Sequence, residues 1–517
     1  MIALLLLFML AGCTGTPENP EPTLSPTAAP SPTQAAPEPS GPTYGGVLRI
    51  PMRLPKTLNP LLNEDETVDT VLRLLYEPLM ALDDTLKPVG NLAGFSFSSD
   101  GMSVSVEIRD GAIWSDGTPV TAEDLAFSIE TLQQAPENAI YKPLVKNISQ
   151  VSVLDERKAR VYLLQPFSGT RYQFRFPIIP KHHFQGATDP GNAANMNPVG
   201  NGLFVFSSYD SKNELKLTAS NATYRQKPFI SSVSAIIVPD QETEMHSYDQ
   251  RLLDVVSAEL ADWGRYRNNQ TTTINEYTTM YYDFIGFNFN NEALSDKRVR
   301  QAVAFLVDAD DAIESIYLSR ADKSITPVNP RSWLYEKNVA SYPLDVQKAK
   351  TLFTQAKFTS KLRILVNTEN VERVKIAQTL ADNLAKADID ATVEELPYDE
   401  YLAKVDAKDF DIFAGGFNLS VIPELSFAFQ YSIDYDNIFG YRDDTTNGLL
   451  ASAFSAVAET SCLKAMSDLQ KRLAEELPCI GIAFRRAAML TDQKVKGPIK
   501  PNMDNIFANI NTWYLTQ

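Results

Sequence analysis

Residues 108–132 read IRDGAIWSDGTPVTAEDLAFSIETL, and this stretch predicts a strand, a tight turn and a capped helix in close succession. Apolar and polar residues alternate strictly over 102–108, which is typical of a half-buried strand. Further along, Thr121 and Asp124 have the spacing of a capping box, and apolar residues then recur at helical intervals. We therefore expect a hairpin strand that is followed by a helix beginning at Ala122.

The rest of the chain repeats these two patterns in an order that predicts an α/β fold. Two glycines and a short apolar run at 44–50 indicate the first strand of a sheet. Where strands and helices alternate along a chain, the strands are expected to be parallel and joined by right-handed crossovers. The segments that read as strand, helix, strand, helix, strand are 363–366, 371–387, 391–396, 398–405 and 410–413, and a helix at 463–477 and a strand at 480–484 follow.

Length and composition indicate an acidic globular protein with several domains. At ~100 to 200 residues per domain, 517 residues make about two to four domains. Hydrophobic residues are 44% and charged residues 21% of the chain, so most of it should fold. A net charge of -17 without a basic patch excludes nucleic acid as a partner, because phosphate would be repelled.

The sequence contains no set of residues that indicates catalysis or metal binding. It has no GxSxG, GxxxxGK[ST] or HExxH motif, and three His and three Cys are too few for most metal sites. On an extended chain the adjacent His182 and His183 would point to opposite faces, so we assign them a structural role, and His246 should be solvated. We expect a protein that is not an enzyme and has neither cofactor nor metal.

Residues 1–13 have the pattern of a lipoprotein signal peptide. Residues 2–11 are all apolar, but crossing a bilayer takes about 20 residues, which favours a signal-peptide core. The run Leu-Ala-Gly-Cys at 10–13 resembles the lipobox of bacterial lipoproteins, in which the thiol of Cys13 would be diacylated. The first three residues carry no Lys or Arg, and an ordinary secretory signal with an incidental Cys is the alternative.

Residues 14–43 are expected to act as a tether. Nine prolines fall within the 27 residues 17–43, where Leu24 is the only large apolar side chain. Such a stretch favours extended polyproline II, which at ~3.1 Å per residue reaches about 80 Å. It would hold a folded domain away from a membrane surface.

Cys462 and Cys479 are predicted to be free thiols. They flank the expected helix 463–477, and a rise of ~1.5 Å per residue places them about 25 Å apart. A disulfide requires Cα atoms ~4.4 to 6.8 Å apart, so the two thiols cannot be bridged while this helix is formed.

Ten short segments, spread from Tyr44 almost to the C-terminus, are together specific enough to suggest a family. They are GGVLRI (45–50), TLNPLL (57–62), YEPLMALD (76–83), the stretch 108–132, PIIPKHHF (177–184), NPVGNGLFVF (197–206), YYDFIGFNFNN (281–291), DKRVRQAVAFLVD (296–308), YPLDVQKAKTLF (342–353) and FDIFAGGFN (410–418). In order and spacing they resemble the extracellular solute-binding proteins of family 5, the peptide/nickel type that supplies ABC importers.

The resemblance implies a periplasmic-binding-protein-like α/β fold with two hinged lobes and an inserted third lobe. Its base lobe would comprise 44–82, 198–286 and 480–517. Residues 83–197 would form the inserted lobe and 287–479 the third lobe. The ligand would be trapped between the base lobe and the third lobe, and the run of aromatic residues from Tyr281 would mark a hinge strand.

The resemblance also suggests where ligand would bind. The residues expected to face the hinge are Phe417, Asn418 and Ser420, with Arg331, Trp333 and Tyr335 from PRSWLY, and Asn59 from TLNP. Peptide-binding relatives commonly have an Asp near the position of Ser420, which pairs with the free α-amino group of the peptide. A serine supplies no charge to offset burial of that cation, so we expect weak recognition of free peptide N-termini unless the loop is realigned to use Glu424.

The expected function is that of an extracytoplasmic substrate-binding lipoprotein of an ABC importer, which captures a small solute of the peptide class. Its partners would be the solute, an ABC permease and, through a lipid anchor, the outer face of the cell membrane, and we expect a monomer. Three alternatives stay open. They are a receptor for an oligosaccharide, opine or metal chelate, a peptide-sensing lipoprotein without a transport role, and an extracellular hydrolase with an unrecognised site.

Overall fold

The computed structural model describes residues 41–187, 189–221, 225–258, 260–422, 431 and 437–516. The chain divides into two compact units, Met1–Gly41 and Pro42–Gln517, and the fold below is that of the second. Cys13 lies outside the described residues, as does all but the end of the expected tether, so signal peptide, lipid attachment and tether stay predictions. No helix in the described ranges is long and apolar enough to cross a membrane.

The stretch 108–132 forms the predicted strand and capped helix. Strand β5 (Ser103–Ile108) is followed by helix α2 (Ala122–Gln134), and the capping box is present, because the Thr121 side chain accepts from the Asp124 N–H and Asp124 Oδ2 accepts from the Thr121 N–H at 2.9 Å. The Nε1–H of the buried Trp114 also donates to Asp124 Oδ2, at 3.2 Å. The order of this antiparallel sheet is β4 (Ala93–Phe97), β5, β7 (Lys158–Leu163) and β6 (Ile148–Val153).

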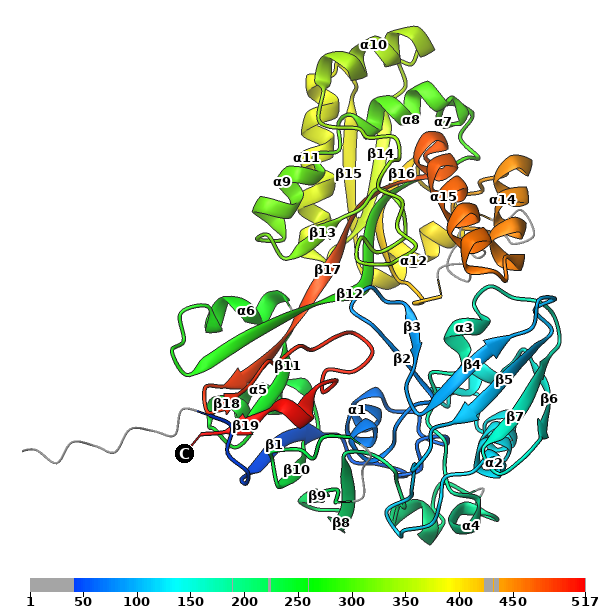
Figure 1. Ribbon diagram of the computed structural model, residues 1–517. Helices are drawn as coiled ribbons and strands as arrows, with labels where there is room; N and C mark the ends of the chain where they lie inside the picture. The colour runs from blue at the N-terminus through cyan, green and yellow to red at the C-terminus, as the bar shows by residue number, and fades with distance from the viewer. Residues whose placement is uncertain are drawn as a thin grey trace, which may run out of the picture. The chain divides into compact units, whose positions relative to one another are not determined.

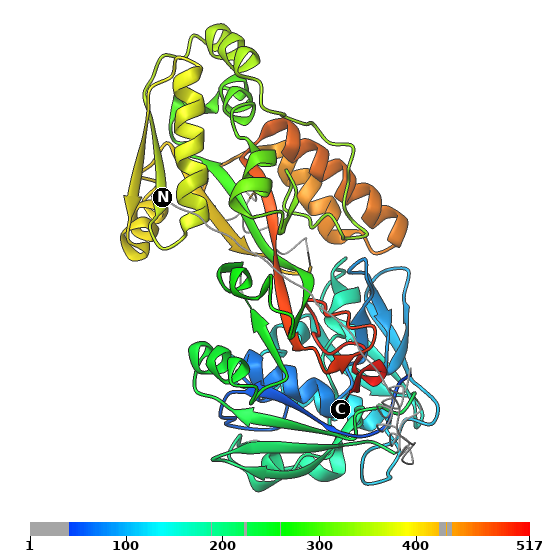
Figure 2. The ribbon, with the colours of Figure 1, turned by 90° about the vertical axis from the view of Figure 1, so that its left-hand side faces the viewer.

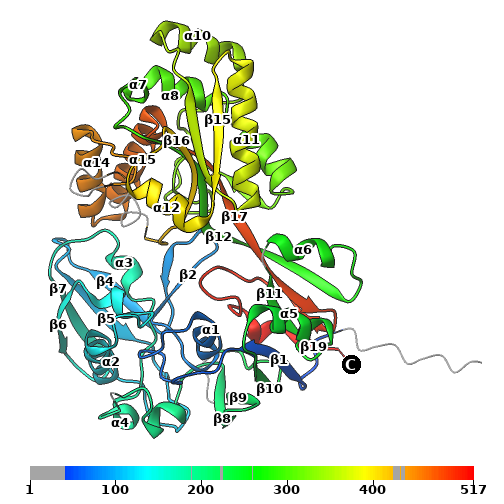
Figure 3. The ribbon, with the colours of Figure 1, turned by 180° about the vertical axis from the view of Figure 1, so that it is seen from behind.

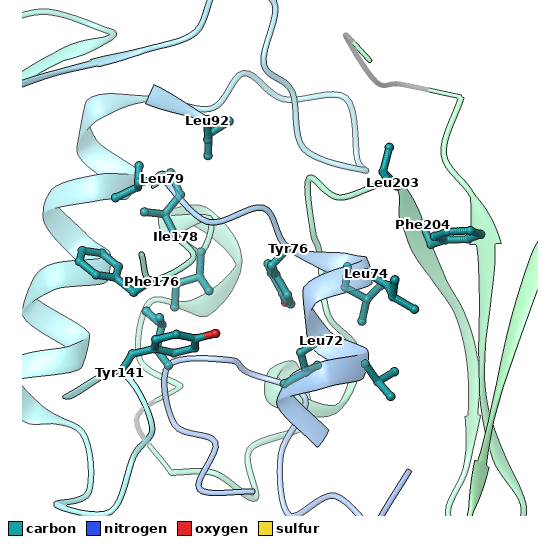
Figure 4. Close-up of a cluster of buried hydrophobic side chains, with 14 of the residues drawn as sticks. Leu72, Leu74, Tyr76, Leu79, Leu92, Tyr141, Phe176, Ile178, Leu203 and Phe204 are labelled. Carbon is teal, nitrogen blue, oxygen red and sulfur yellow. The ribbon is translucent and has the colours of Figure 1, made fainter. Parts of the chain in front are cut away.

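A second sheet consists of the first strand of this unit and three strands from residues 204–237. Its order is β1 (Val47–Met52), β10 (Ser232–Ile237), β9 (Glu214–Ala219) and β8 (Phe204–Asp210), with β1 parallel to β10. Helix α1 (Glu66–Leu75), capped by Asp65, contacts β1 and β8. In Figure 4, Leu74 of α1 points toward Leu203 and Phe204, and Tyr76 lies on the side of Phe176 and Ile178, so this helix stands in the middle of one core.

The third sheet has seven strands and contains the longest ones. Its order is β11 (Val255–Ala258), β17 (Cys479–Asp492), β12 (Thr272–Phe287), β16 (Ile412–Asn418), β14 (Leu362–Asn367) and β15 (Ala391–Leu396), and β13 (Ala321–Lys323) pairs with β17. As predicted, β14 runs parallel to β15 and β16. Strands β12 and β17 lie side by side and antiparallel along most of their length (Figure 1).

Successive side chains of a strand point to opposite faces of this sheet, so the apolar residues of one strand belong to two different cores. Ile364 and Val366 of β14 belong to the core with helices α8 (Lys297–Ala304) and α11 (Val371–Lys386). Leu365 belongs to the core with α12 (Tyr398–Asp406) and α15 (Glu459–Glu476). Both faces of the part of the sheet in which β14 runs parallel to β15 and β16 are therefore covered by helices, as is usual for parallel strands. Figure 2 shows α11 (yellow) running along the strands, and Figure 3 shows it on the other side of the sheet from α15.

The remaining elements are short and connect these sheets. They are β2 (Met80–Leu82) paired with β3 (Pro88–Gly90), β18 (Val495–Lys496) paired with β19 (Tyr514–Leu515), α3 (Thr170–Gln173), α4 (Lys181–Phe184), α5 (Gln241–Asp249), α6 (Leu260–Tyr266), α7 (Glu292–Ser295), α9 (Ala309–Asp311), α10 (Val346–Ala356), α14 (Asp444–Ser455), and η1 to η4 (Lys142–Val145, Ala193–Met196, Ala312–Ile316 and Ile510–Thr512).

Three expectations from the sequence need correction. His182 and His183 lie in the helical turn α4, not on an extended chain, and His182 Nε2 lies 2.7 Å from a carboxylate oxygen of Asp116. Strand β16 extends to Asn418 through two glycines, and β17 is 14 residues long where five were expected because it continues through Arg485 and Arg486; in both strands additional residues pair with β12.

Neither Cys462 nor Cys479 forms a disulfide, as predicted, and both are buried. Cys479 Sγ lies 3.2 Å from the hydroxyl oxygen of Tyr431. Burial raises the pKa of the Cys479 thiol to about 12, so it stays protonated and unreactive at neutral pH.

Candidate ligand-binding site

The seven-stranded sheet is narrowest in the middle of strand β12. Strand β11 pairs with β17 only at 488–491, whereas β16 pairs with β12 only from Tyr281 onward. Between these regions Tyr277 and Thr278 pair with β17 alone, and the register of the two strands shifts between Thr278 and Tyr282. Strand β13 flanks β17 at 483–485, beside the register shift, so the sheet is two strands wide only at Tyr277 and Thr278. A narrow strip next to a register shift bends more easily than the wider sheet on either side, so this is where a hinge is expected.

A cavity of about 360 Å³ lies against this narrow point. Four segments that are distant in sequence line it: the turn between β2 and β3, the start of β12, the turn that carries Arg331, and the segment after β18 (red in Figure 1). The lining residues are Asp83, Asp84, Leu86, Asn275, Glu276, Tyr277, Thr278, Arg331, Ile499, Lys500, Pro501, Asn502 and Met503.

Two of the carboxylates that line this cavity are engaged by the protein itself. Asp83 Oδ1 accepts from the backbone N–H groups of Thr85 and Lys87 at 2.8 and 3.0 Å, and so shapes the turn. Burial by itself would raise the pKa of Asp83, but hydrogen bonds from the Thr85 hydroxyl and from these backbone N–H groups hold it below its ordinary value. Glu276 lies 3.4 Å from Arg486 and 3.7 Å from Arg320.

Arg331 is the best-placed cation among the residues expected to bind ligand. Its side chain is 54% exposed, and its Nε lies 3.8 Å from Asp322 Oδ2. That carboxylate is already engaged, because Arg486 Nε lies 3.2 Å from both of its oxygens and Thr278 Oγ1 donates to it at 2.6 Å. Desolvation alone would raise the pKa of Asp322, but these partners lower it, so Asp322 stays ionised and Arg331 is held only loosely.

Trp333 and Tyr335 follow Arg331 in the chain but do not line this cavity. The indole Nε1–H of Trp333 donates to the hydroxyl of Tyr172 at 2.9 Å. Tyr335 lines a second cavity of about 210 Å³, beneath the segment 337–342. Both side chains are half-buried against one apolar cluster.

Phe417 and Asn418 are the last two residues of β16, opposite Tyr282 and Tyr281 of β12. The ring of Phe417 stacks on Phe284 with centroids 4.8 Å apart, and Asn418 is exposed. Ser420 Oγ accepts from the Ile422 N–H at 3.0 Å. Phe417 packs against the same large apolar cluster as Trp333 and Tyr335.

Asn59 is not brought together with the other candidates. It is only 1% exposed, its amide donates to Asn195 Oδ1 at 2.9 Å, and its side-chain oxygen accepts from the Leu61 N–H at 3.0 Å. These contacts give Asn59 a structural role in the core around α1. Glu424 lies outside the described residues.

Sequence reasoning missed two walls of the cavity, the β2–β3 turn and the segment 499–503. Gly497, Pro498 and Pro501 fall within five residues, which is typical of a loop, and Asp83 followed by Thr85 has the pattern of a side-chain-capped turn. Nothing in one sequence indicates that the two loops face each other. Among the described residues, no group of three or more His, Cys, Asp and Glu side chains could hold a metal ion.

Comparisons with known proteins agree with this architecture. The family model described as "Bacterial extracellular solute-binding proteins, family 5 Middle" matches residues 87–437. The chain is 22% identical over 505 residues to the oligopeptide-binding protein AppA of Bacillus subtilis, covering 90% of each chain. It superposes on the ABC transporter substrate-binding protein CtaP of Listeria monocytogenes with a TM-score of 0.78 and 22% identity, over 92% of this chain and 100% of that one.

A further structure, of the binding protein AgaA of A. tumefacien R10 in complex with agropinic acid, matches with a TM-score of 0.62 and 21% identity over 91% of this chain and 99% of that one. The chain belongs to the bacterial extracellular solute-binding proteins of family 5. The periplasmic-binding-protein-like fold inferred from the ten segments is thereby confirmed.

Proposed function

We propose that the chain is the solute-binding component of an ABC importer, capturing a small solute in the cavity beside β12 and passing it to a membrane permease. One observation carries this proposal. Four segments from distant parts of the chain wall a cavity of about 360 Å³ at the point where the central sheet is only two strands wide. Bending at that point would change the distance between the walls, as capture and release require. The role is one of binding, without catalysis.

We further propose the lobes expected from the sequence as the moving parts. Residues 44–82, 198–286 and 480–517 would form the base lobe, 83–197 the inserted lobe and 287–479 the third lobe. The ligand-bound protein should be more compact than the open one. Small-angle scattering should then give a smaller radius of gyration with bound solute, and an identical profile with and without solute would argue for a rigid binder or sensor.

For the solute itself we propose a peptide-class ligand that is not held by its α-amino group. Relatives named for oligopeptides and dipeptides support the class. The second part rests on Ser420, which stands where peptide-binding relatives commonly have an Asp and which can accept a hydrogen bond but cannot neutralise a buried ammonium group. Ser420 is not among the residues that line the cavity beside β12, so this part of the proposal is separate from the choice of cavity. A solute without an amine is the second candidate, and the relative solved with agropinic acid shows that the fold is not confined to peptides.

A thermal-shift screen tests this choice. A ligand at ~100 times its Kd stabilises the folded state by about 2.7 kcal/mol, which such a screen detects. We expect N-acetylated tetrapeptides to stabilise the protein as much as the same peptides with free amines. Stabilisation by the free-amine peptides alone would contradict the inference from Ser420, and stabilisation by sugars alone would favour a receptor of another class.

We propose that the protein is anchored at the outer face of the cell membrane through lipid on Cys13 and acts there as a monomer. The apolar run, the lipobox and the Pro-rich segment behind it support this. A Cys13→Ala chain should leave the membrane fraction of cells, and unchanged association with membranes would contradict lipidation. A role in peptide sensing without transport would be favoured if no permease gene adjoins the gene for this chain.

A further inference from the structure

Trp333 contacts two segments that lie far from it in the sequence, around Thr85 and around Tyr172. Its backbone N–H donates to Thr85 O at 2.9 Å, and its indole N–H donates to the hydroxyl of Tyr172 at 2.9 Å. Two cations flank its ring: Lys87 Nζ is 5.2 Å and Arg171 Cζ is 5.6 Å from the ring centroid. Both distances are within the range of cation–π attraction.

The groups that hold Trp333 are themselves fixed. Lys87 Nζ pairs with a carboxylate oxygen of Glu459 at 2.8 Å, and Arg171 Nη2 donates to Val457 O at 2.6 Å. Tyr172 is 1% exposed. Trp333 is therefore held by several contacts at once, with Thr85, Lys87, Arg171 and Tyr172.

The turn that carries Trp333 is tight enough to transmit its position to Arg331. Asn329 Nδ2 donates to Thr279 O of β12 at 3.1 Å, and Asn329 Oδ1 accepts from the Arg331 N–H at 2.9 Å. The Ser332 N–H closes the turn on Asn329 O at 2.8 Å. Arg331 thus lies between an anchor on β12 and an anchor at Trp333.

Two of the four segments that line the cavity meet at this contact. The Trp333 N–H donates to Thr85 O, and Thr85 belongs to the same turn as the lining residues Asp83, Asp84 and Leu86, while Arg331 belongs to a second lining segment. We propose that Trp333 is a positioning residue for solute binding: by docking its turn onto Thr85, Lys87 and Tyr172, it sets the separation between Arg331 and the β2–β3 turn across the cavity. This inference rests on the proposed function, because it takes that cavity as the solute site.

The docking is testable without any solute. Trp114, Trp263 and Trp513 are fully buried, so acrylamide quenching of tryptophan emission should respond mainly to Trp333, and a Trp333→Phe chain gives the background. A Tyr172→Phe/Lys87→Gln chain should be quenched more strongly than the unaltered protein. Lys181→Gln is the matched control, since Lys181 pairs with Glu123 at 2.9 Å on the surface away from the cavity, and its quenching should not change. Equal quenching in all three chains would overturn the docking.

The positioning role is tested by a double-mutant cycle with N-acetyl-tetraalanine as the probe, measured by isothermal titration calorimetry. Trp333→Leu should weaken binding by about fivefold or more, the scale of coupling within one contact network. In an Arg331→Gln background the same substitution should have little further effect. An equal loss in both backgrounds would overturn the proposal, because Trp333 would then act independently of Arg331. Failure of the probe to bind the unaltered protein would count against the proposed solute class, while the quenching result would still decide the docking.

Discussion

Asp283→Asn should destabilise this protein more than any exposed carboxylate substitution, because Asp283 is a buried anion surrounded by hydrogen-bond donors. It is 1% exposed, and its Oδ1 accepts from Arg373 Nε at 2.8 Å. Its Oδ2 accepts from Arg485 Nε at 2.5 Å and from the Tyr317 hydroxyl at 2.7 Å. Asparagine keeps the shape but loses the charge and replaces one acceptor with a donor.

The expected loss is about 3 to 5 kcal/mol, the usual cost of removing one partner from a buried ion pair. Guanidinium denaturation should show it as a lower transition midpoint. Asp409→Asn is the matched control, because Asp409 pairs with Arg363 and Lys404 at the surface with 54% of its side chain exposed, and it should change the midpoint little. Equal midpoints for the two variants would refute the reasoning.

The pH dependence follows from the same contacts. Burial would raise the pKa of Asp283, but Arg485 and Arg373 lower it below the ordinary value. A carboxyl group with a depressed pKa in the folded state contributes stability above its unfolded pKa of about 4 and loses it as the pH falls through the folded value. The difference between the unaltered protein and Asp283→Asn should therefore be full at neutral pH and shrink in acid. A difference that grew on acidification would show that the sign is wrong.

Two further predictions concern residues away from this cluster. In a Cys13→Ser chain, alkylation under denaturing, non-reducing conditions should add two labels, on Cys462 and Cys479, and a count of zero would mean that they are bridged. A methyl group at Gly481 would lie 1.9 Å from the Tyr282 hydroxyl oxygen, whereas one at Gly264 in α6 meets nothing within 4 Å. Gly481→Ala should thus lower the unfolding temperature. Gly264→Ala should keep or raise the unfolding temperature, because alanine favours the helix over glycine by up to ~1 kcal/mol. Equal effects of the two substitutions on the unfolding temperature would contradict this.

The sequence predicted the regular elements well where local signals determine them. The helix from Ala122 is specified by its capping box, and the parallel strands β14, β15 and β16 by alternation with helices. Such signals lie within a few residues of one another, so a single sequence contains them.

The candidate site could be predicted only in part, because its contacts join distant segments. Trp333 was expected to bind ligand, yet its indole is engaged by Tyr172, 161 residues away. Asn59 has a side chain that could bind a ligand, but its amide donates a hydrogen bond to Asn195 within a core. Arg331 was identified, whereas Lys500, in another segment that lines the cavity, was not, since no pattern in the sequence indicates that the two segments line one cavity.

The position of β17 in the middle of its sheet has a consequence for how the protein folds. Glu276 of β12 and Arg486 of β17 are neighbours although 210 residues separate them. A chain growing from its N-terminus cannot join β11 to β12 until almost all of it has been synthesised, and contacts of such long range make folding slow. Until then the edge of β12 that later pairs with β17 has no partner strand, so this part of the sheet stays unformed. A chain truncated before Cys479 would lack the strand that completes the sheet.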